Sequence, residues 1–456
     1  MSFLTLNSFK SESAQIIKLG LPVTIAQMGM IFQGLADTIM LGHYSTDNMA
    51  AAGFVNGLFL LGILLNLGFS MGSISQIGKR YSQNKNSEIV SLLKSSLIAN
   101  FIQCLLLTIA MIGLLLFIPY LGQPVELLPL MRIYLLILVT SLPLFAFLNG
   151  AKHFFDSIND TEVSMWVLIG GNIWNVLFNY FLIFGKMGFP EMGIAGAAIA
   201  TVSARVIMLI AFALVFLLAD KYKKYRDVWR ESPATRRHIS LLNHLGWPIS
   251  IQLGLESASF SLLGIMLGWI GVTALASHQI MHTLSGVVLM FYLGIGESVS
   301  IRVSNYKGLG NMEGVRNVSN TGYVMTFIIG LTLSIVLFLT RNKLGYIFTD
   351  NVDVTRTVAT MILPMVLYQL GDGLQINYSN ALRGFGDVKM LMRYSVLAYI
   401  IISLPLSYLF GILLDGGAPG VWMGLPFGLT TAGLLYYFRF RKITRPYCNR
   451  KVKLPL

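Results

Sequence analysis

Twelve long apolar segments follow one another along this chain, with only short polar connections between them. They lie near 15–42, 49–77, 92–118, 127–150, 163–185, 193–219, 241–271, 275–301, 321–340, 354–382, 391–414 and 417–438. About 20 apolar residues in a helix cross the hydrocarbon core of a bilayer, so each segment is long enough to span it. Charged residues make up 12% of the chain, about half of their share in soluble proteins. The sequence therefore predicts an all-α polytopic membrane protein with twelve transmembrane helices and no sizeable soluble domain.

The basic residues lie mostly on one side of these predicted crossings. Of the 33 Lys and Arg, 27 fall in the N-terminal segment, the even-numbered loops and the C-terminal tail, and five fall on the other side. Short loops rich in Lys and Arg stay in the cytoplasm. We therefore expect a multi-pass protein of the bacterial inner (plasma) membrane with both termini in the cytoplasm. The net charge of +13 then reflects topology and contact with anionic membrane lipids, with no nucleic-acid partner.

The second half of the chain repeats the first. LGLPVTI at 19–25 recurs as LGWPISI at 245–251, and LPL at 142–144 recurs as LPM at 363–365. Each repeat holds six crossings, an even number, so both start on the same side of the membrane and form parallel repeats with a cavity expected between them. The predicted domains are an N-terminal lobe at 1–219, a cytoplasmic linker at 220–240, a C-terminal lobe at 241–440 and a basic tail at 441–456.

Four prolines lie well inside predicted crossings: Pro22, Pro143, Pro248 and Pro364. Proline removes a backbone donor and kinks a helix unless neighbouring groups compensate. Each bend is either a hinge or a static packing kink, and the sequence leaves both interpretations open.

Two acidic residues lie deep in the second half. Glu256 is roughly 22 Å from the start of its predicted helix, and Asp372 is roughly 27 Å from the opposite start of its own helix. Two neighbouring carboxylates in a low dielectric cannot both stay ionised without a positive partner. The pair is therefore expected to bind a proton, a metal cation or a cationic ligand by turns, unless hydroxyl groups hold it in a purely structural role. Tyr368 lies one helical turn before Asp372 on the same face, and Gln375 and Asn377 follow it. Hard oxygen ligands would suit Na⁺, whereas a proton would need only the carboxylates, and the sequence leaves both open.

The first half carries a different polar set. Asp37 lies in the first crossing and Arg205 in the sixth, while Asn172, Asn175 and Asn179 form one stripe on the fifth. We expect a possible N-lobe polar site here. Asp37 either has a mechanistic role or forms a structural pair with Arg205, since charges inside membranes usually find partners.

Three further residues attract attention and carry less weight. His278 and His282 have the i, i+4 spacing of a metal pair, but no third ligand accompanies them, so a polar helix face is the favoured interpretation. Glu297 lies near the cytoplasmic end of the eighth crossing and is interpreted as reaching the membrane interface.

Several motifs resemble the multidrug and toxic compound extrusion (MATE) family. They are QGLADTIMLG at 33–42, NIWNVLFNYFLIFG at 172–185, GFPEMGIAGAAIAT at 188–201 and ALRGFGD at 381–387. The segments PISIQLGLE at 248–256, SHQI at 277–280, IRV at 301–303 and YQLGDGLQ at 368–375 are similar to the NorM-like branch. The resemblance covers nearly the whole chain.

This resemblance implies a V-shaped pair of six-helix bundles and export of cationic, amphipathic compounds in exchange for inward Na⁺ or H⁺. It places the cation site at Glu256, Asp372 and Tyr368, and gives Asp37 a coupling role. Glu297 departs from the usual NorM pattern, and Arg205 occurs only in some branches. No cofactor beyond the coupling ion and no partner subunit is expected, so the protein is interpreted as a monomer.

Other functions fit the sequence less well. A flippase for lipid-linked oligosaccharides or polysaccharides, from the same superfamily, would need basic residues to meet pyrophosphate, whereas the deep charges here are mostly acidic. An intramembrane enzyme would need a nucleophile with its base or a set of metal ligands, and no such motif is present. A channel fits less well than a transporter because proline-kinked repeats with buried carboxylates favour stepwise exchange.

Overall fold

The computed structural model describes residues 6–121 and 124–445, and these residues are almost entirely helical. The first half contains α1 (Leu6–Tyr44), α2 (Thr46–Met71), α3 (Ile74–Ser82), α4 (Asn86–Phe117), α5 (Leu128–Thr140), α6 (Leu142–Ser157), α7 (Thr161–Phe184) and α8 (Gly193–Leu218). A linker with η3 (Asp220–Tyr222) and α9 (Lys223–Arg226) follows. The second half contains α10 (Arg236–Ile270), α11 (Val272–Gly308), α12 (Met312–Leu344), α13 (Val352–Phe385), α14 (Lys389–Ser395), η5 (Val396–Ser403), α15 (Leu404–Tyr408), η6 (Leu409–Leu413) and α16 (Gly417–Thr444).

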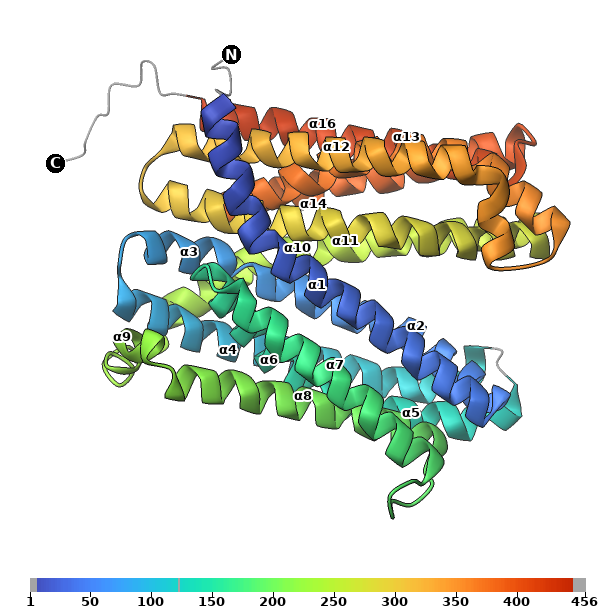
Figure 1. Ribbon diagram of the computed structural model, residues 1–456, viewed down its shortest axis with the longest axis horizontal. Helices are drawn as coiled ribbons and strands as arrows, with labels where there is room; N and C mark the ends of the chain where they lie inside the picture. Colours follow the sequence, from blue (N-terminus) through green and yellow to red (C-terminus); the bar gives the residue numbers. More distant parts are fainter. Residues whose placement is uncertain (1–5, 122–123, 446–456) are drawn as a thin grey trace.

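The helices form two bundles that lie side by side. Figure 1 shows α2 to α8 in one bundle and α10 to α16 in the other, with the helices of each running nearly parallel to its long axis. The bundles meet at the end of the molecule where α1 begins and α16 ends, which we call the basic end, and they diverge toward the opposite end (Figure 1). The all-α, two-bundle fold predicted from the sequence is confirmed.

Ten helical segments among the described residues are long and apolar enough to cross a membrane, and a bent pair of helices makes an eleventh. The twelfth predicted crossing is α16, which is present as a helix of 28 residues but is not among these apolar segments. Its first half is rich in glycine and carries Pro419 and Pro426. Because α16 packs closely against α13 and the α14–η6 segment, these small residues lie at helix contacts, where close packing favours them over large apolar side chains.

Only one of the four prolines coincides with a break in a helix. The chain bends by 41° between Val125–Thr140 and Leu142–Ser157, and Pro143 lies in the first turn of the second helix. That first turn is where proline removes no helical hydrogen bond. Pro22, Pro248 and Pro364 lie inside the continuous helices α1, α10 and α13.

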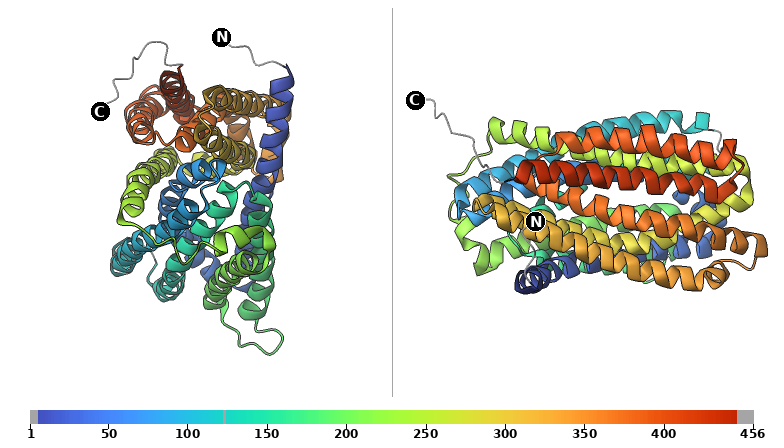
Figure 2. Two further views of the ribbon diagram at one scale, coloured as in Figure 1. Left: turned by 90° about the vertical axis from the view of Figure 1, so that its left-hand side faces the viewer. Right: turned by 90° about the horizontal axis from the view of Figure 1, so that it is seen from above.

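The first helix crosses from one bundle to the other, as Figure 1 and the left view of Figure 2 show. Near its start, the Glu12 carboxylate accepts hydrogen bonds from Arg302 on α11 at 2.8 and 3.0 Å and from the Tyr306 hydroxyl at 2.5 Å. Ile16 and Leu19 belong to the apolar core of the second bundle. The first half of α1 therefore packs on the second bundle, although its second half packs on α7 in the first.

Gly20 allows this helix to approach α11 closely. A Cβ atom at Gly20 would lie 2.8 Å from the carbonyl oxygen of Gly294 and 2.9 Å from the hydroxyl of Ser298. Gly34, further along α1, faces open space, with nothing within 4 Å of such an atom.

These two glycines give a matched test of the contact between α1 and α11. Gly20→Ala should lower the apparent Tm by a few degrees, because overpacking a tight contact costs about 1–3 kcal/mol. Gly34→Ala should leave Tm unchanged or raise it, since alanine is the better helix former by about 1 kcal/mol. Thermal unfolding in detergent measures both. Equal effects of the two substitutions would contradict the close approach at Gly20.

Candidate functional site

The two acidic residues predicted in the second half lie in the same bundle and act on each other electrostatically. Glu256 on α10 is half-buried and accepts a hydrogen bond from Gln375 Nε2 of α13 at 3.4 Å. Asp372 on α13 is buried, with 3% of its surface exposed, and its charge interacts with that of Glu256. Asp372 makes no hydrogen bond or ion pair with residues 6–121 and 124–445. The geometry thus brings together two carboxylates from α10 and α13.

One cation acts on a member of this pair, Glu256. Arg383 is a buried residue that lies further along α13 than Asp372, and it interacts electrostatically with Glu256. Its guanidinium donates to Gln252 Oε1 of α10 at 2.9 Å and contacts Met71 Sδ of α2, in the other bundle, at 3.5 Å. Arg383 forms no ion pair in the described chain, so it acts on Glu256 only through space. The ionised carboxylates of Glu256 and Asp372 together with the Arg383 guanidinium would carry one net negative charge.

Polar groups with free bonding capacity lie beside Asp372 on the same helix. Gln369 and Gln375 flank it at three-residue spacing, which places all three on one face of α13. The side-chain oxygens of both glutamines are buried and accept no hydrogen bond among the described residues. Unpartnered buried oxygens next to a carboxylate are the type of ligand set that a hard cation takes.

Tyr368 lies next to the carboxylates and packs against two other aromatic rings. Its ring packs edge to face against Phe260 of α10 and Trp422 of α16, with ring centroids 6.4 and 6.2 Å apart. Trp422 Nε1 donates to His278 Nδ1 at 3.2 Å. His278 is thus a hydrogen-bond partner inside the bundle, and His278 and His282 belong to no group of three metal ligands in the described chain. This arrangement is consistent with the interpretation of His278 and His282 as part of a polar helix face and not as a metal pair.

A second polar site lies in the first bundle around Asp37. Its carboxylate accepts a hydrogen bond from Asn179 Nδ2 of α7. In the amide orientation that satisfies both of its polar atoms, Asn175 donates to Asp37 at 2.9 Å and accepts from the Thr201 hydroxyl of α8 at 3.3 Å. Asn172 lies one turn away, buried, with no hydrogen-bond partner for either side-chain atom among the described residues. Neutral amides therefore surround Asp37.

Arg205 lies elsewhere in the first bundle, and no ion pair with Asp37 forms. Its guanidinium donates to the Ser141 hydroxyl at the break between α5 and α6. The charge also lies over the rings of Phe145 and Phe59, 5.0 and 5.5 Å from their centroids. Cation–π contacts of this kind stabilise a desolvated cation, so Arg205 is held at the helix break and does not compensate Asp37.

A buried charged cluster joins the two bundles at the basic end. Lys152 Nζ of α6 donates to Asp156 on the same helix at 2.8 Å and to Glu297 of α11 at 2.6 Å. His153 Nδ1 lies 3.6 Å from Glu297 and 3.9 Å from Asp156. All four side chains are buried. We call these residues the inter-lobe cluster. The prediction that Glu297 reaches the interface is wrong, because Lys152 offers it an ion pair inside the protein.

The same cluster is the one group in the described chain with the spacing of a metal site. Ligand atoms of His153, Asp156 and Glu297 all lie within 4.8 Å of one another. The Lys152 ammonium, however, already bonds to both carboxylates, so a metal ion would have to displace it. The sequence did not indicate that Lys152 and Arg383 are buried, because both lie near helix ends, among the basic residues of the loops.

The spacing of four residues between Lys152 and Asp156 is the sequence feature that could have indicated a buried ion pair.

Inter-lobe hydrogen bonds are confined to this half of the molecule. Gln83 Nε2 donates to the Gly308 carbonyl at 2.8 Å, and Asn305 Nδ2 donates to Asn159 Oδ1 at 2.9 Å. The inter-lobe hydrogen bond farthest from the basic end joins the Ser250 hydroxyl to the Leu65 carbonyl at 2.6 Å. Beyond this level, toward the opposite end, no hydrogen bond or ion pair joins the two bundles in residues 6–121 and 124–445.

Comparison with known proteins decides the family. The MatE family model matches residues 22–181 and 248–409, one match in each half of the chain. The chain belongs to the MATE family. It is also NorM-like: it is 26% identical over 449 residues to the multidrug resistance protein NorM of Photobacterium profundum, covering 96% of this chain and 97% of that protein.

Other relatives agree with this assignment. The probable multidrug resistance protein NorM of Shewanella oneidensis is 29% identical over 441 residues, covering 95% of each chain. Among solved structures, a crystal structure of MATE in the straight conformation is 20% identical, covers 95% of this MATE protein and 96% of that chain, and superposes with a TM-score of 0.86. That structural similarity shows the fold.

The inter-lobe cluster of this MATE protein makes a specific prediction about stability. Lys152→Met leaves two buried carboxylates without their ammonium, and it should lower the free energy of unfolding by about 3–5 kcal/mol, as measured by thermal unfolding. Adding Glu297→Gln to Lys152→Met should recover part of this loss, because one of the two charges is then removed. Lys85→Gln serves as the control, since the pair of Lys85 with Glu88 is solvent-exposed and should contribute about 1 kcal/mol or less. If the double variant is less stable than Lys152→Met, the cluster does not hold its carboxylates in ionised form.

Proposed function

We propose that this MATE protein is a secondary active efflux transporter, which exports cationic amphipathic compounds in exchange for inward Na⁺ or H⁺. The observation that carries this proposal is the charge balance in the second bundle. Glu256 and Asp372 act on each other, and the one cation that acts on the pair, Arg383, acts on Glu256. A buried site with one excess negative charge must take up a cation or a proton, because an uncompensated buried charge is costly.

Exchange follows from competition for that charge. An inward-moving cation and an outward-moving cationic compound can each satisfy the carboxylates, but both cannot do so at once without overcompensating them. Each ligand therefore displaces the other, and this competition couples their movements. With Na⁺ as coupling ion, the carboxylates of Glu256 and Asp372 and the hydroxyl of Tyr368 would supply oxygen ligands; with H⁺, the carboxylates alone would suffice.

The first bundle supplies a second negative site. Asp37 is bonded to the neutral amides of Asn179 and Asn175, so it too can bind a cation or a proton. The unpartnered amide of Asn172 lies on the same helix as these two. We assign Asp37 to cation coupling or cargo binding in the N-terminal lobe, with Asn172 as a further polar contact. Arg205, held over two aromatic rings at the helix break, has no part in this site.

The cargo class follows from the same groups. Aromatic rings next to carboxylates bind organic cations well, because the ring face and the carboxylate both attract positive charge. Tyr368 lies one helical turn before Asp372, and its ring packs against those of Phe260 and Trp422. The relatives named NorM are described as multidrug resistance proteins, which supports the same class of cargo. The deep carboxylates disfavour a pyrophosphate-linked lipid as cargo.

Alternating access would require the two bundles to separate at the basic end. In the present conformation, the inter-lobe cluster and the bonds from Gln83 and Asn305 hold that end together, whereas no such bond holds the opposite end among the described residues. With both termini in the cytoplasm, this conformation is closed toward the cytoplasm. The bundles would then move as lobes about the linker at 220–240, with the sites of both lobes exposed alternately.

The central test is transport by purified protein in liposomes. Ethidium movement should follow an imposed Na⁺ gradient or an imposed pH gradient, and the effective gradient identifies the coupling ion. Glu256→Gln and Asp372→Asn should each abolish ion-driven transport, because each removes a negative charge from the site. Glu231→Gln, in the exposed linker, is the charge-matched control and should transport normally. Undiminished transport in the double variant, E256Q with D372N, would contradict the proposal.

A second test addresses the movement of the lobes. Cysteines replacing Asn159 and Asn305 should form a link with a short thiol-specific cross-linker, since these two side chains bond to each other across the bundles at 2.9 Å. The native Cys448 is replaced by serine and the buried Cys104 is kept. Transport should stop on cross-linking and return when a cleavable linker is cut, while either single cysteine variant should be insensitive. Full transport in the cross-linked protein would rule out separation of the lobes at the basic end.

A further inference from the structure

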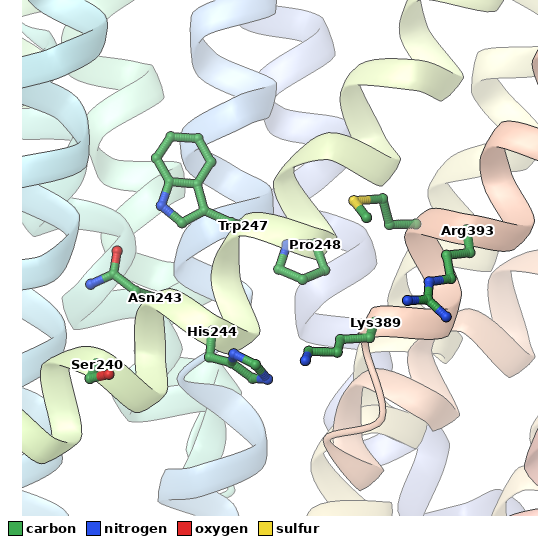
Figure 3. A pocket seen from close by; sticks show the side chains of 8 residues that line it. Ser240, Asn243, His244, Trp247, Pro248, Lys389 and Arg393 are labelled. Carbon is green, nitrogen blue, oxygen red and sulfur yellow. The ribbon is translucent and has the colours of Figure 1, made fainter.

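A pocket lies between α10 and α14, outside both polar sites described above. Its volume is about 520 Å³. In Figure 3 the ring of His244 on α10 points toward Lys389 of α14, Arg393 lies further along α14, and Trp247 points away from both cations. His244, Trp247, Lys389 and Arg393 are all solvent-exposed in the described chain. The pocket therefore opens to the surface of the second bundle, near the basic end.

The two cations of this pocket have no partner within the described part of the protein. No acidic residue lines the pocket, and neither Lys389 nor Arg393 forms an ion pair or hydrogen bond in residues 6–121 and 124–445. The acid nearest in sequence, Asp387, is already bonded to Arg439 at 2.5 Å. Two other basic side chains at this end have acidic partners, Arg80 with Glu88 and Arg302 with Glu12. Lys389 and Arg393 are thus available to an external anion.

The surface around the pocket becomes more apolar along the helix axes. Ser240, Asn243, His244 and Lys389 lie nearest the basic end, while Trp247 and Pro248 lie further along α10, and Met392 and Arg393 lie further along α14. Beyond the pocket the exposed apolar surface continues with Ile251 on α10 and with Val396 and Ile400 on η5, each 39% exposed. Cations at the membrane surface followed by apolar side chains toward the membrane interior match the polarity of a phospholipid, from headgroup to acyl chain.

Trp247 marks the level of the membrane interface and links the pocket to the seam between the bundles. Tryptophan is enriched where headgroups meet hydrocarbon, because its ring is apolar and its N–H is polar. One edge of the Trp247 ring packs against Phe69 of α2, in the other bundle, with centroids 5.6 Å apart. A lipid seated against Trp247 would therefore lie beside the contact between the lobes.

We propose that the pocket between α10 and α14 is a binding site for an anionic phospholipid, whose phosphate lies between Lys389 and Arg393 and whose acyl chain follows Ile251 and Val396. Two unpaired cations favour an anionic headgroup over a zwitterionic one. The graded surface favours a lipid over a soluble phosphate compound, which would gain nothing from Trp247, Met392 or the apolar surface beyond them. This inference does not depend on the transported compound or the coupling ion.

The test uses quenching of Trp247 fluorescence by brominated lipids in nanodiscs of phosphatidylcholine. Brominated phosphatidylglycerol should quench more than brominated phosphatidylcholine at equal mole fraction, and Trp247→Phe should remove this difference, leaving the five other tryptophans of the six as background. K389Q with R393Q should weaken the apparent affinity for phosphatidylglycerol about 30-fold, since each cation near the membrane surface contributes about a factor of five. K223Q with R230Q, which removes two exposed cations from the linker, should leave the preference unchanged.

Two outcomes would overturn the proposal. Equal quenching by the two brominated lipids in the unsubstituted protein, or a preference for phosphatidylglycerol that survives K389Q with R393Q, would show that the pocket does not select an anionic lipid. Relief of quenching by glycerol 3-phosphate at concentrations equal to those of the lipid would show that a soluble phosphate ester is the ligand. Because all five substituted residues are exposed, loss of folding does not complicate these comparisons.

Discussion

An ionised side chain in the membrane interior must be compensated, and the polar groups of this protein are arranged by that requirement. Arg205 lies over two aromatic rings and donates to Ser141, Lys152 bonds to two carboxylates, and Arg383 acts on Glu256 through space. Each cation is thereby stabilised, whereas the carboxylates together remain undercompensated. Transport of positively charged species needs this excess of negative charge, since a fully neutralised interior would offer a cation no reason to enter.

The helices were predictable because the membrane imposes one condition on every crossing. A spanning segment must be long, apolar and helical, so hydropathy alone located each of the helices or helix pairs, from α1 to α16. The internal repeat added the arrangement in two bundles. Helix ends were predicted less well: α10 and α11 extend beyond their predicted segments at the basic end, because hydropathy marks where lipid ends and a helix can continue into water. The domain boundaries themselves stay a prediction, and the basic tail at 446–456 with Cys448 lies outside the described residues.

The candidate site was predictable only in part, because pairing depends on which faces of distant helices meet. Glu256 and Asp372 stood out through their depth, and the structure places them where their charges interact. The expected pair of Asp37 and Arg205 does not form, since α8 turns Arg205 toward the break between α5 and α6. Lys152 and Glu297 are 145 residues apart in sequence, and no local pattern relates them. Their functional roles, like that of the cation site as a whole, remain proposals.

The two repeats share their helices but not their charges. Aligned by the repeat of 19–25 with 245–251, Glu256 corresponds to Met30 and Asp37 corresponds to Leu263. Aligned by the repeat of 142–144 with 363–365, Asp372 corresponds to Ala151. Duplication thus preserved the packing of the bundles, while acidic residues occupy different positions in each. Because the paired carboxylates with their single arginine occur only in the second bundle, and Asp37 with its neutral amides only in the first, the two lobes offer different ligand sets to the proposed exchange cycle.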